Sequence, residues 1–233
     1  MRADRSCSPI PGVTYGSVPA AGPATDRPAA AHPDLNLAIR GYALTSNYRG
    51  LIDLAGDTDP RAPQLGGLFA PLRRPVFTNL YRVYDWDWAH NRKGDLLIDP
   101  PVTLVEIAAA PEEIIYLPAS GYHIWGDYQA FVLYATPARL TLKYTREDNV
   151  VWGYTIHVEN ICVEPSLLRL YQQMDRAGRG QLPALRSGQP LGRAWGANIG
   201  VAIRDTGRFM DPRSRRDWWR GFTQNEQSIT EQE

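Results

Sequence analysis

The segment Asp85-Trp86-Asp87-Trp88 is the most chemically distinctive stretch of this sequence, because two indole rings alternate with two carboxylates. Successive side chains of a strand point to opposite faces, so Trp86 and Trp88 would share one face and the two aspartates the other. An aromatic pair beside carboxylates is suited to stacking on sugar rings or on a protein partner. The same pattern is also typical of tryptophans that pack into a core, and both interpretations stay open.

Other residues that could do chemistry are sparse. The 233 residues include two cysteines, Cys7 and Cys162, and four histidines. Two cysteines are too few for a metal cluster or a disulfide framework. We expect Cys162, which lies in an apolar stretch, to be a small buried side chain. No histidine belongs to a nucleophile-elbow motif, and there is no glycine-rich phosphate loop.

The charge is balanced, with 25 basic and 25 acidic residues and an isoelectric point near 6.9. Proteins that bind nucleic acid or an anionic membrane generally carry a basic excess, so the composition argues against both partners. No apolar run approaches the roughly 18 residues that a membrane-spanning helix needs. The first residues also lack the apolar centre of a signal peptide, so we expect any export signal to have been removed already.

The elements that must position functional residues are expected to be mainly strands. Residues 1–33 are rich in Pro, Ala, Gly and Ser, which predicts a disordered linker. Residues 34–118 are expected to form a β-rich lead domain, because short apolar runs alternate with Pro, Gly, Asp and Asn. The strands expected in this domain are 76–77, 80–84, 96–98, 102–107 and 114–117.

The strand pattern is stronger after residue 119. Residues 139–158 alternate on both sides of a polar turn at 147–149, which predicts a β-hairpin. One helix is expected to begin at Pro165, which suits the first helical position, and to end before Gly178. The expected fold over 119–222 is a small, β-barrel-like hybrid sheet with this helix inserted.

The end of the chain completes the expected organisation. Trp218 and Trp219 are adjacent, and we expect both to dock back on the sheet rather than form an exposed patch. Residues 223–233 are expected to be a polar tail.

Five fragments occur in an order that is known from one family. They are Leu133–Ala138, Gly153–Val158, Leu168–Met174, Leu185–Gly192 with its Gly-Gln-x-x-Gly motif, and the stretch Gly196–Pro212. Together they resemble the lysostaphin-type (LytM-like) zinc endopeptidases of bacterial cell walls, which have the duplicated hybrid motif fold. The resemblance implies a zinc ion with three protein ligands and an open position for water.

The residues at the family's catalytic positions are mostly replaced. His123 and Asp127 have the spacing of its first two ligands, but its H-x-H segment reads Asn198-Ile199-Gly200 here. Gln173 stands where the family has a further catalytic histidine. Glycine cannot bind zinc and neither amide titrates, so the resemblance implies a degenerate site without acid–base partners.

We therefore expect a non-catalytic binding or regulatory domain, extracellular or in the cell envelope, with no cofactor. Its partners would be peptidoglycan, another envelope glycan or a wall enzyme. They would bind in the groove that corresponds to the family's substrate groove. The residues expected to line it are His123, Asp127, Tyr171, Gln173 and Asn198.

Two alternatives remain open. One is an active zinc-dependent peptidoglycan endopeptidase, which needs His123, Asp127 and either His157 or another histidine to converge on the metal. However, His157 alternates with Ile156 and Val158, and a surface or hydrogen-bonded strand histidine is the simpler interpretation. The other alternative is a carbohydrate-binding module built on Trp86 and Trp88.

Overall fold

The computed structural model describes residues 7–223, and in them the chain is mainly β, as the sequence predicts. These residues form 14 strands, which pair antiparallel in one large and one small sheet. Both sheets are open rather than closed barrels, since the large sheet ends at β1 on one side and at β2 on the other. Residues 1–6 of the expected linker and 224–233 of the expected tail lie outside the described residues.

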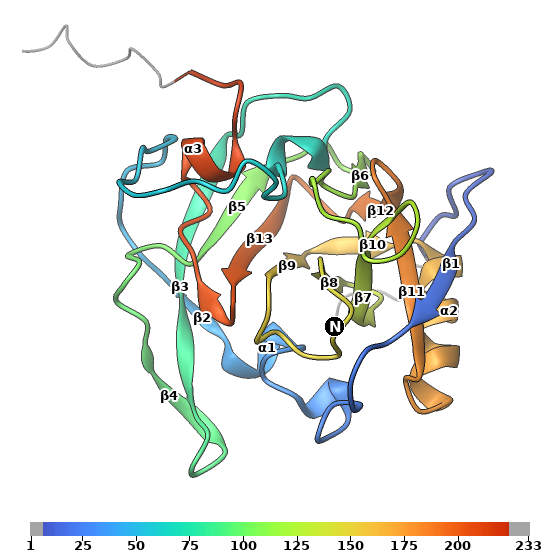
Figure 1. Ribbon diagram of the computed structural model, residues 1–233. Coiled ribbons are helices and arrows are strands. Elements are labelled where there is room, and N and C mark those ends of the chain that lie inside the picture. The colour runs from blue at the N-terminus through green and yellow to red at the C-terminus, as the bar shows by residue number, and fades with distance from the viewer. Residues whose placement is uncertain (1–6, 224–233) are drawn as a thin grey trace, which may run out of the picture.

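The large sheet has 11 strands in the order β1-β11-β7-β8-β9-β13-β5-β3-β2, with β14 paired to β13 and β4 to β3 (Figure 1). Strands from both expected domains share this sheet, because β5 pairs with β13, so the sheet does not divide at residue 118. The bounds are β1 (Gly16–Pro19), β2 (Tyr42–Leu44), β3 (Phe77–Asp87), β4 (Arg92–Leu96), β5 (Leu104–Ala108), β7 (Tyr128–Thr136), β8 (Arg139–Lys143), β9 (Tyr154–Glu159), β11 (Gln181–Arg186), β13 (Asn198–Asp205) and β14 (Arg208–Phe209).

The small sheet and the helices complete the fold. The small sheet has the order β10-β12-β6, and the hairpin expected over 139–158 is present as β8 and β9. The bounds are β6 (Ile114–Tyr116), β10 (Ile161–Val163), β12 (Pro190–Ala194), α1 (Leu37–Arg40), α2 (Pro165–Arg176) and α3 (Arg215–Trp218). In the part of the chain that the structure describes, no helix is long and apolar enough to cross a membrane.

The predicted start of a helix at Pro165 and the predicted docking of Trp218 and Trp219 are both confirmed. Helix α2 begins at Pro165, and the Glu164 carboxylate caps it by accepting from the backbone N–H groups of Ser166 and Leu167. Trp218 and Trp219 are both buried, and their indole N–H groups donate to backbone carbonyls. A buried indole needs such an acceptor, so the C-terminal segment docks on the sheet with its polar atoms satisfied.

The N-terminal segment differs from the expected linker. Strand β1 pairs with β11 at the edge of the large sheet, and a disulfide joins Cys7 to Cys162 in β10. The composition is poor in large apolar residues, but Val18 and Ala29 are buried in the core. These contacts and the cross-link offset the conformational entropy that predicted disorder. Cys162 is therefore a disulfide partner and not simply a small buried apolar residue.

Strands β8, β9 and β13 have two chemically different faces, because apolar and polar side chains alternate along each strand. One face carries Leu142, Ile156 and Val201 and packs in the main hydrophobic core. We call the opposite face the polar face. Its residues are Arg139, Thr141 and Lys143 in β8, Thr155, His157 and Glu159 in β9, and Asn198, Gly200, Ala202 and Arg204 in β13.

Candidate functional site

A row of side chains crosses the polar face at its Gly200 end. Gly200 pairs with Glu159 in β9 on one side and with Glu106 in β5 on the other. Two carboxylates therefore flank a residue that has no side chain, and we call Glu159–Gly200–Glu106 the acceptor row. Because neighbouring strands lie about 4.8 Å apart, the two glutamate side chains leave the sheet roughly 10 Å from each other.

The acceptor row forms part of the wall of a surface hollow of about 260 Å³. The glycine keeps this hollow open: a Cβ atom at Gly200 would lie 3.0 Å from the Cβ of Glu159. Any other residue would therefore crowd the glutamate and occupy the floor. The hollow is lined by Tyr42, Leu104, Glu106, Ala138, Arg139, Glu159, Asn160, Trp195, Asn198 and Gly200.

Amide groups hold the carboxylate of Glu106 in place. Its Oε2 accepts from Asn79 Nδ2 at 2.7 Å and from Asn198 Nδ2 at 3.3 Å. The Oδ1 of Asn198 in turn accepts from Asn160 Nδ2 at 3.1 Å. This chain of hydrogen bonds orients the acceptor of Glu106 and the amide of Asn198 toward the same hollow.

Glu159 sits in a very different environment. Its side chain is almost completely buried, and burial raises the pKa of this carboxyl to about 7. Arg139 Nε lies 3.3 Å from its Oε2 but is not aligned for a hydrogen bond, so this attraction offsets the burial only in part. Near neutral pH the carboxyl is therefore divided between two forms, and it can donate or accept a hydrogen bond.

The residues expected to line one groove are not all brought together. Asn198 lines the hollow, but Gln173 is exposed on α2 and contributes to a separate depression. Tyr171, also on α2, is buried, and its hydroxyl accepts from Arg179 Nη1 at 3.2 Å. Helix α2 packs on β7 and β11, so it does not reach the wall of this hollow.

The expected zinc ligands also do not meet at one point. His123 and Asp127 are exposed in the loop before β7, where Asp127 forms an ion pair with Arg186. His157 is fully buried on the polar face, where its Nδ1 lies 3.1 Å from Thr141 Oγ1, so it is the hydrogen-bonded strand histidine rather than a surface residue. Within residues 7–223, no three His, Cys, Asp or Glu side chains are grouped to hold a metal. The three residues that the endopeptidase alternative needs do not converge.

Trp86 and Trp88 are unequally exposed. Trp88 lies at the turn of the β3–β4 hairpin, with 47 % of its surface exposed and Arg27 placed 5.5 Å from its ring centre. Trp86 is half-buried, and its indole N–H has no hydrogen-bond partner among the described residues. The hairpin therefore presents one well-exposed indole rather than a matched pair.

Sequence reasoning missed Glu106 and Glu159. Their alternation with Val105, Ile107 and Val158 does place them on polar strand faces. What brings them to either side of one glycine is the register of three strands that are far apart in the chain. The register between such distant strands cannot be predicted from a single sequence.

No family model, curated protein or solved structure matches this chain. The resemblance to lysostaphin-type endopeptidases therefore stays a prediction. What the fold and the site define is a class: an open antiparallel β protein with a carboxylate-lined hollow on one sheet face.

Proposed function

We propose that this protein is a non-catalytic binding domain of the cell envelope and that the hollow at the acceptor row holds a glycan. The observation that carries the proposal is the pairing of Gly200 with Glu106 and Glu159, which leaves space between two carboxyl groups. A residue without a side chain at that position makes room for a ligand.

The chemistry of the lining supports a hydroxyl-rich ligand. Carboxylates accept hydrogen bonds from sugar hydroxyls, and the amide of Asn198 can both donate and accept. The lining also includes Trp195 and Tyr42, the latter 37 % exposed, and aromatic rings are suited to packing against the apolar face of a sugar. A hollow with a few polar groups between apolar surfaces is typical of small-ligand sites.

The disulfide supports a location outside the cytoplasm. The bond between Cys7 and Cys162 closes a loop with a sequence separation of 155 residues. Such structural disulfides form and persist in oxidising compartments and are rare where thiols are kept reduced. An envelope or extracellular location would also place the hollow within reach of wall glycans.

Co-sedimentation with purified peptidoglycan tests the proposal, with soluble glycan fragments as competitors. Gly200→Val should fill the floor of the hollow and weaken binding at least about tenfold, which corresponds to 1.4 kcal/mol. Gly196→Val is the matched control, since a Cβ at Gly196 meets nothing within 4 Å. Glu106→Gln should also weaken binding, because it removes a charged acceptor at nearly constant volume.

Equal loss in Gly196→Val and Gly200→Val would place the glycan elsewhere on the surface. Absence of any sedimentation of the native chain with peptidoglycan would reject this ligand class. Circular dichroism of each variant confirms that the sheet has formed before binding is compared.

A further inference from the structure

A second row of polar side chains crosses the polar face at its other end. Lys143 in β8 pairs with Thr155 in β9, and Thr155 pairs with Arg204 in β13. All three side chains can donate hydrogen bonds, and two carry positive charge, so we call Lys143–Thr155–Arg204 the donor row. It lies four residues along each strand from Arg139, Glu159 and Gly200.

The donor row is buried beneath the N-terminal segment. Residues 21–40, which we call the cover, run from β1 across the sheet toward β2 (Figure 1). The backbone carbonyl of Leu35 accepts from the hydroxyl of Thr141 at 2.6 Å, two residues from Lys143 on the same face. Each member of the donor row is less than a twentieth exposed.

Burial under the cover leaves two members of the row unpaired. Lys143 Nζ and Thr155 Oγ1 have no hydrogen-bond partner among residues 7–223. Glu147 in the β8–β9 turn attracts Lys143, but its Oε2 is itself buried without a partner and no hydrogen bond joins the two side chains in the described residues. Buried donors are almost always paired in folded proteins, so Lys143 and Thr155 are donors for which the closed structure supplies no acceptor within hydrogen-bonding distance.

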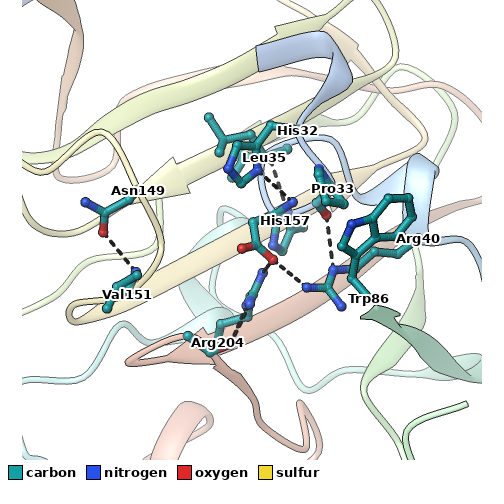
Figure 2. A network of polar contacts seen from close by, with 12 residues as sticks. His32, Pro33, Leu35, Arg40, Trp86, Asn149, Val151, His157 and Arg204 are labelled. Atoms are coloured by element: carbon teal, nitrogen blue, oxygen red, sulfur yellow. Dashed lines mark hydrogen bonds and ion pairs between the residues drawn. The ribbon is translucent and has the colours of Figure 1, made fainter. Parts of the chain in front are cut away.

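The third member of the row does have an acceptor, and the cover supplies it. Arg204 Nη1 donates to Asp34 Oδ1 at 2.8 Å, and Arg40 Nη2 donates to the same oxygen at 2.6 Å. Figure 2 shows the guanidinium groups of Arg40 and Arg204 turned toward each other, with dashed lines that mark their contacts. A carboxylate of the chain itself therefore occupies the arginine end of the donor row.

We propose that the donor row is a binding site for a ligand that carries carboxylates, and that Asp34 occupies it in the closed state. The cover is then a displaceable segment, and its removal exposes Arg204 together with the unpaired Lys143 and Thr155. An incoming dicarboxylate satisfies the arginine through one end and the lysine through the other. The site is separate from the hollow at the acceptor row, so either assignment can fail alone.

The chain is well suited to a test because it contains two lysines, Lys93 and Lys143. Lys93 is exposed on β4 and acts as an internal standard for amine acetylation followed by peptide mass spectrometry. In the native chain, Lys143 should react at least roughly tenfold more slowly than Lys93, because it reacts only when the cover opens. Asp34→Asn, which weakens the hold on Arg204, should raise the Lys143-to-Lys93 ratio severalfold.

Succinate is the ligand probe. It should lower the Lys143-to-Lys93 ratio in Asp34→Asn, while sodium chloride of equal ionic strength should leave the ratio unchanged. The matched control is Asp26→Asn, which removes an exposed carboxylate from the same cover without touching Arg204. An equal ratio in the two variants would overturn the role of Asp34, and a ratio unaffected by succinate would overturn the carboxylate site.

Hydrogen exchange of the native chain keeps the proposal testable if Asp34→Asn does not fold. Succinate should accelerate amide exchange in residues 29–40 severalfold by competing with Asp34, and exchange in β11 should not change. Unchanged exchange in residues 29–40 over a succinate series, matched in ionic strength, would also reject the proposal.

Discussion

The acceptor row and the donor row occupy the same face of the same strands, roughly 14 Å apart, yet they differ in charge, exposure and pairing. At the Gly200 end the carboxylates of Glu106 and Glu159 border an open hollow. At the Lys143 end the cover excludes solvent and brings its own carboxylate, Asp34. The alternation of polar and apolar residues alone would expose the whole polar face to water. In the structure this face is exposed at the Gly200 end and covered at the Lys143 end.

The comparison shows that a buried group keeps its charge where a partner outweighs burial, and that burial shifts its pKa where no partner does so. Burial alone would raise the pKa of Asp34, but Arg204 and Arg40 outweigh it and hold this pKa at about 2. Lys143 has no such partner, and burial lowers its pKa to about 8. Glu159 shows the same effect with the opposite sign, since its pKa rises to about 7. Both ends thus hold a group whose protonation is poised near neutrality.

The largest effect is expected from Arg204→Leu, which breaks the ion pair that anchors the cover. Removing one partner of a buried pair leaves the other charge incompletely compensated, so the free energy of unfolding should fall by about 3–5 kcal/mol. Urea unfolding measures the loss. Arg208→Leu, at an exposed position on β14, should change stability by less than about 0.5 kcal/mol. Similar losses in the two variants would contradict a special role for the covered end.

Removal of the disulfide should have the next largest effect. Replacing both Cys7 and Cys162 by serine releases the start of the N-terminal segment, and the free energy of unfolding should fall by about 2–5 kcal/mol. Hydrogen exchange should also become faster in the cover than in β9 and β13. If exchange rises equally throughout the sheet, the tether does not act on the covered end in particular.

Lys143→Met should stabilise the protein by about 1–3 kcal/mol near pH 7, because an unpaired buried charge is replaced by an apolar side chain. The lysine pKa falls from 10.5 in the unfolded chain to about 8 in the folded one. Between these values the unfolded state binds more protons, so this group makes stability rise as pH increases from 8 toward 10. Thermal unfolding across this range should show the rise in the native chain and its absence in Lys143→Met.

Glu159→Gln provides the corresponding measurement at the open end and should have the smallest effect, about 1–2 kcal/mol of stabilisation at pH 7.5. The folded-state pKa of Glu159 is raised, so the folded chain binds more protons than the unfolded chain between pH 4.5 and about 7. The glutamate therefore makes stability fall as pH rises through this window. The difference between native and variant should vanish near pH 4, and a difference that is constant with pH would show that burial of Glu159 is not its cause.

Part of the site is visible in the strand pattern. Residues 139–143 and 154–159 alternate so clearly that the hairpin and its two faces follow from the sequence. This includes the placement of His157 and Ile156 on different faces of their strand. The same alternation alone would turn Lys143 and Glu159 toward solvent, but both side chains are buried. The cover that buries the lysine comes from more than a hundred residues earlier in the chain, and it begins in the segment whose composition predicted disorder.

The groove expected from the family resemblance shows a second limit. Of the five residues expected to line it, Asn198 lines the hollow, whereas His123, Asp127, Tyr171 and Gln173 do not. Those four belong to a loop and a helix whose positions depend on packing between distant segments.

The sequence by itself determined the mainly β class, the amphipathic hairpin, helix α2 with its Pro165 start and the docking of Trp218 and Trp219, since these depend on local periodicity and apolar content. Only the tertiary structure decided that Glu159, Gly200 and Glu106 form one row, that Cys7 meets Cys162 and that Asp34 reaches Arg204. These contacts join residues far apart in the chain. Strand register, chain crossing and the burial of unpaired charge are properties of the whole fold, which no local pattern contains.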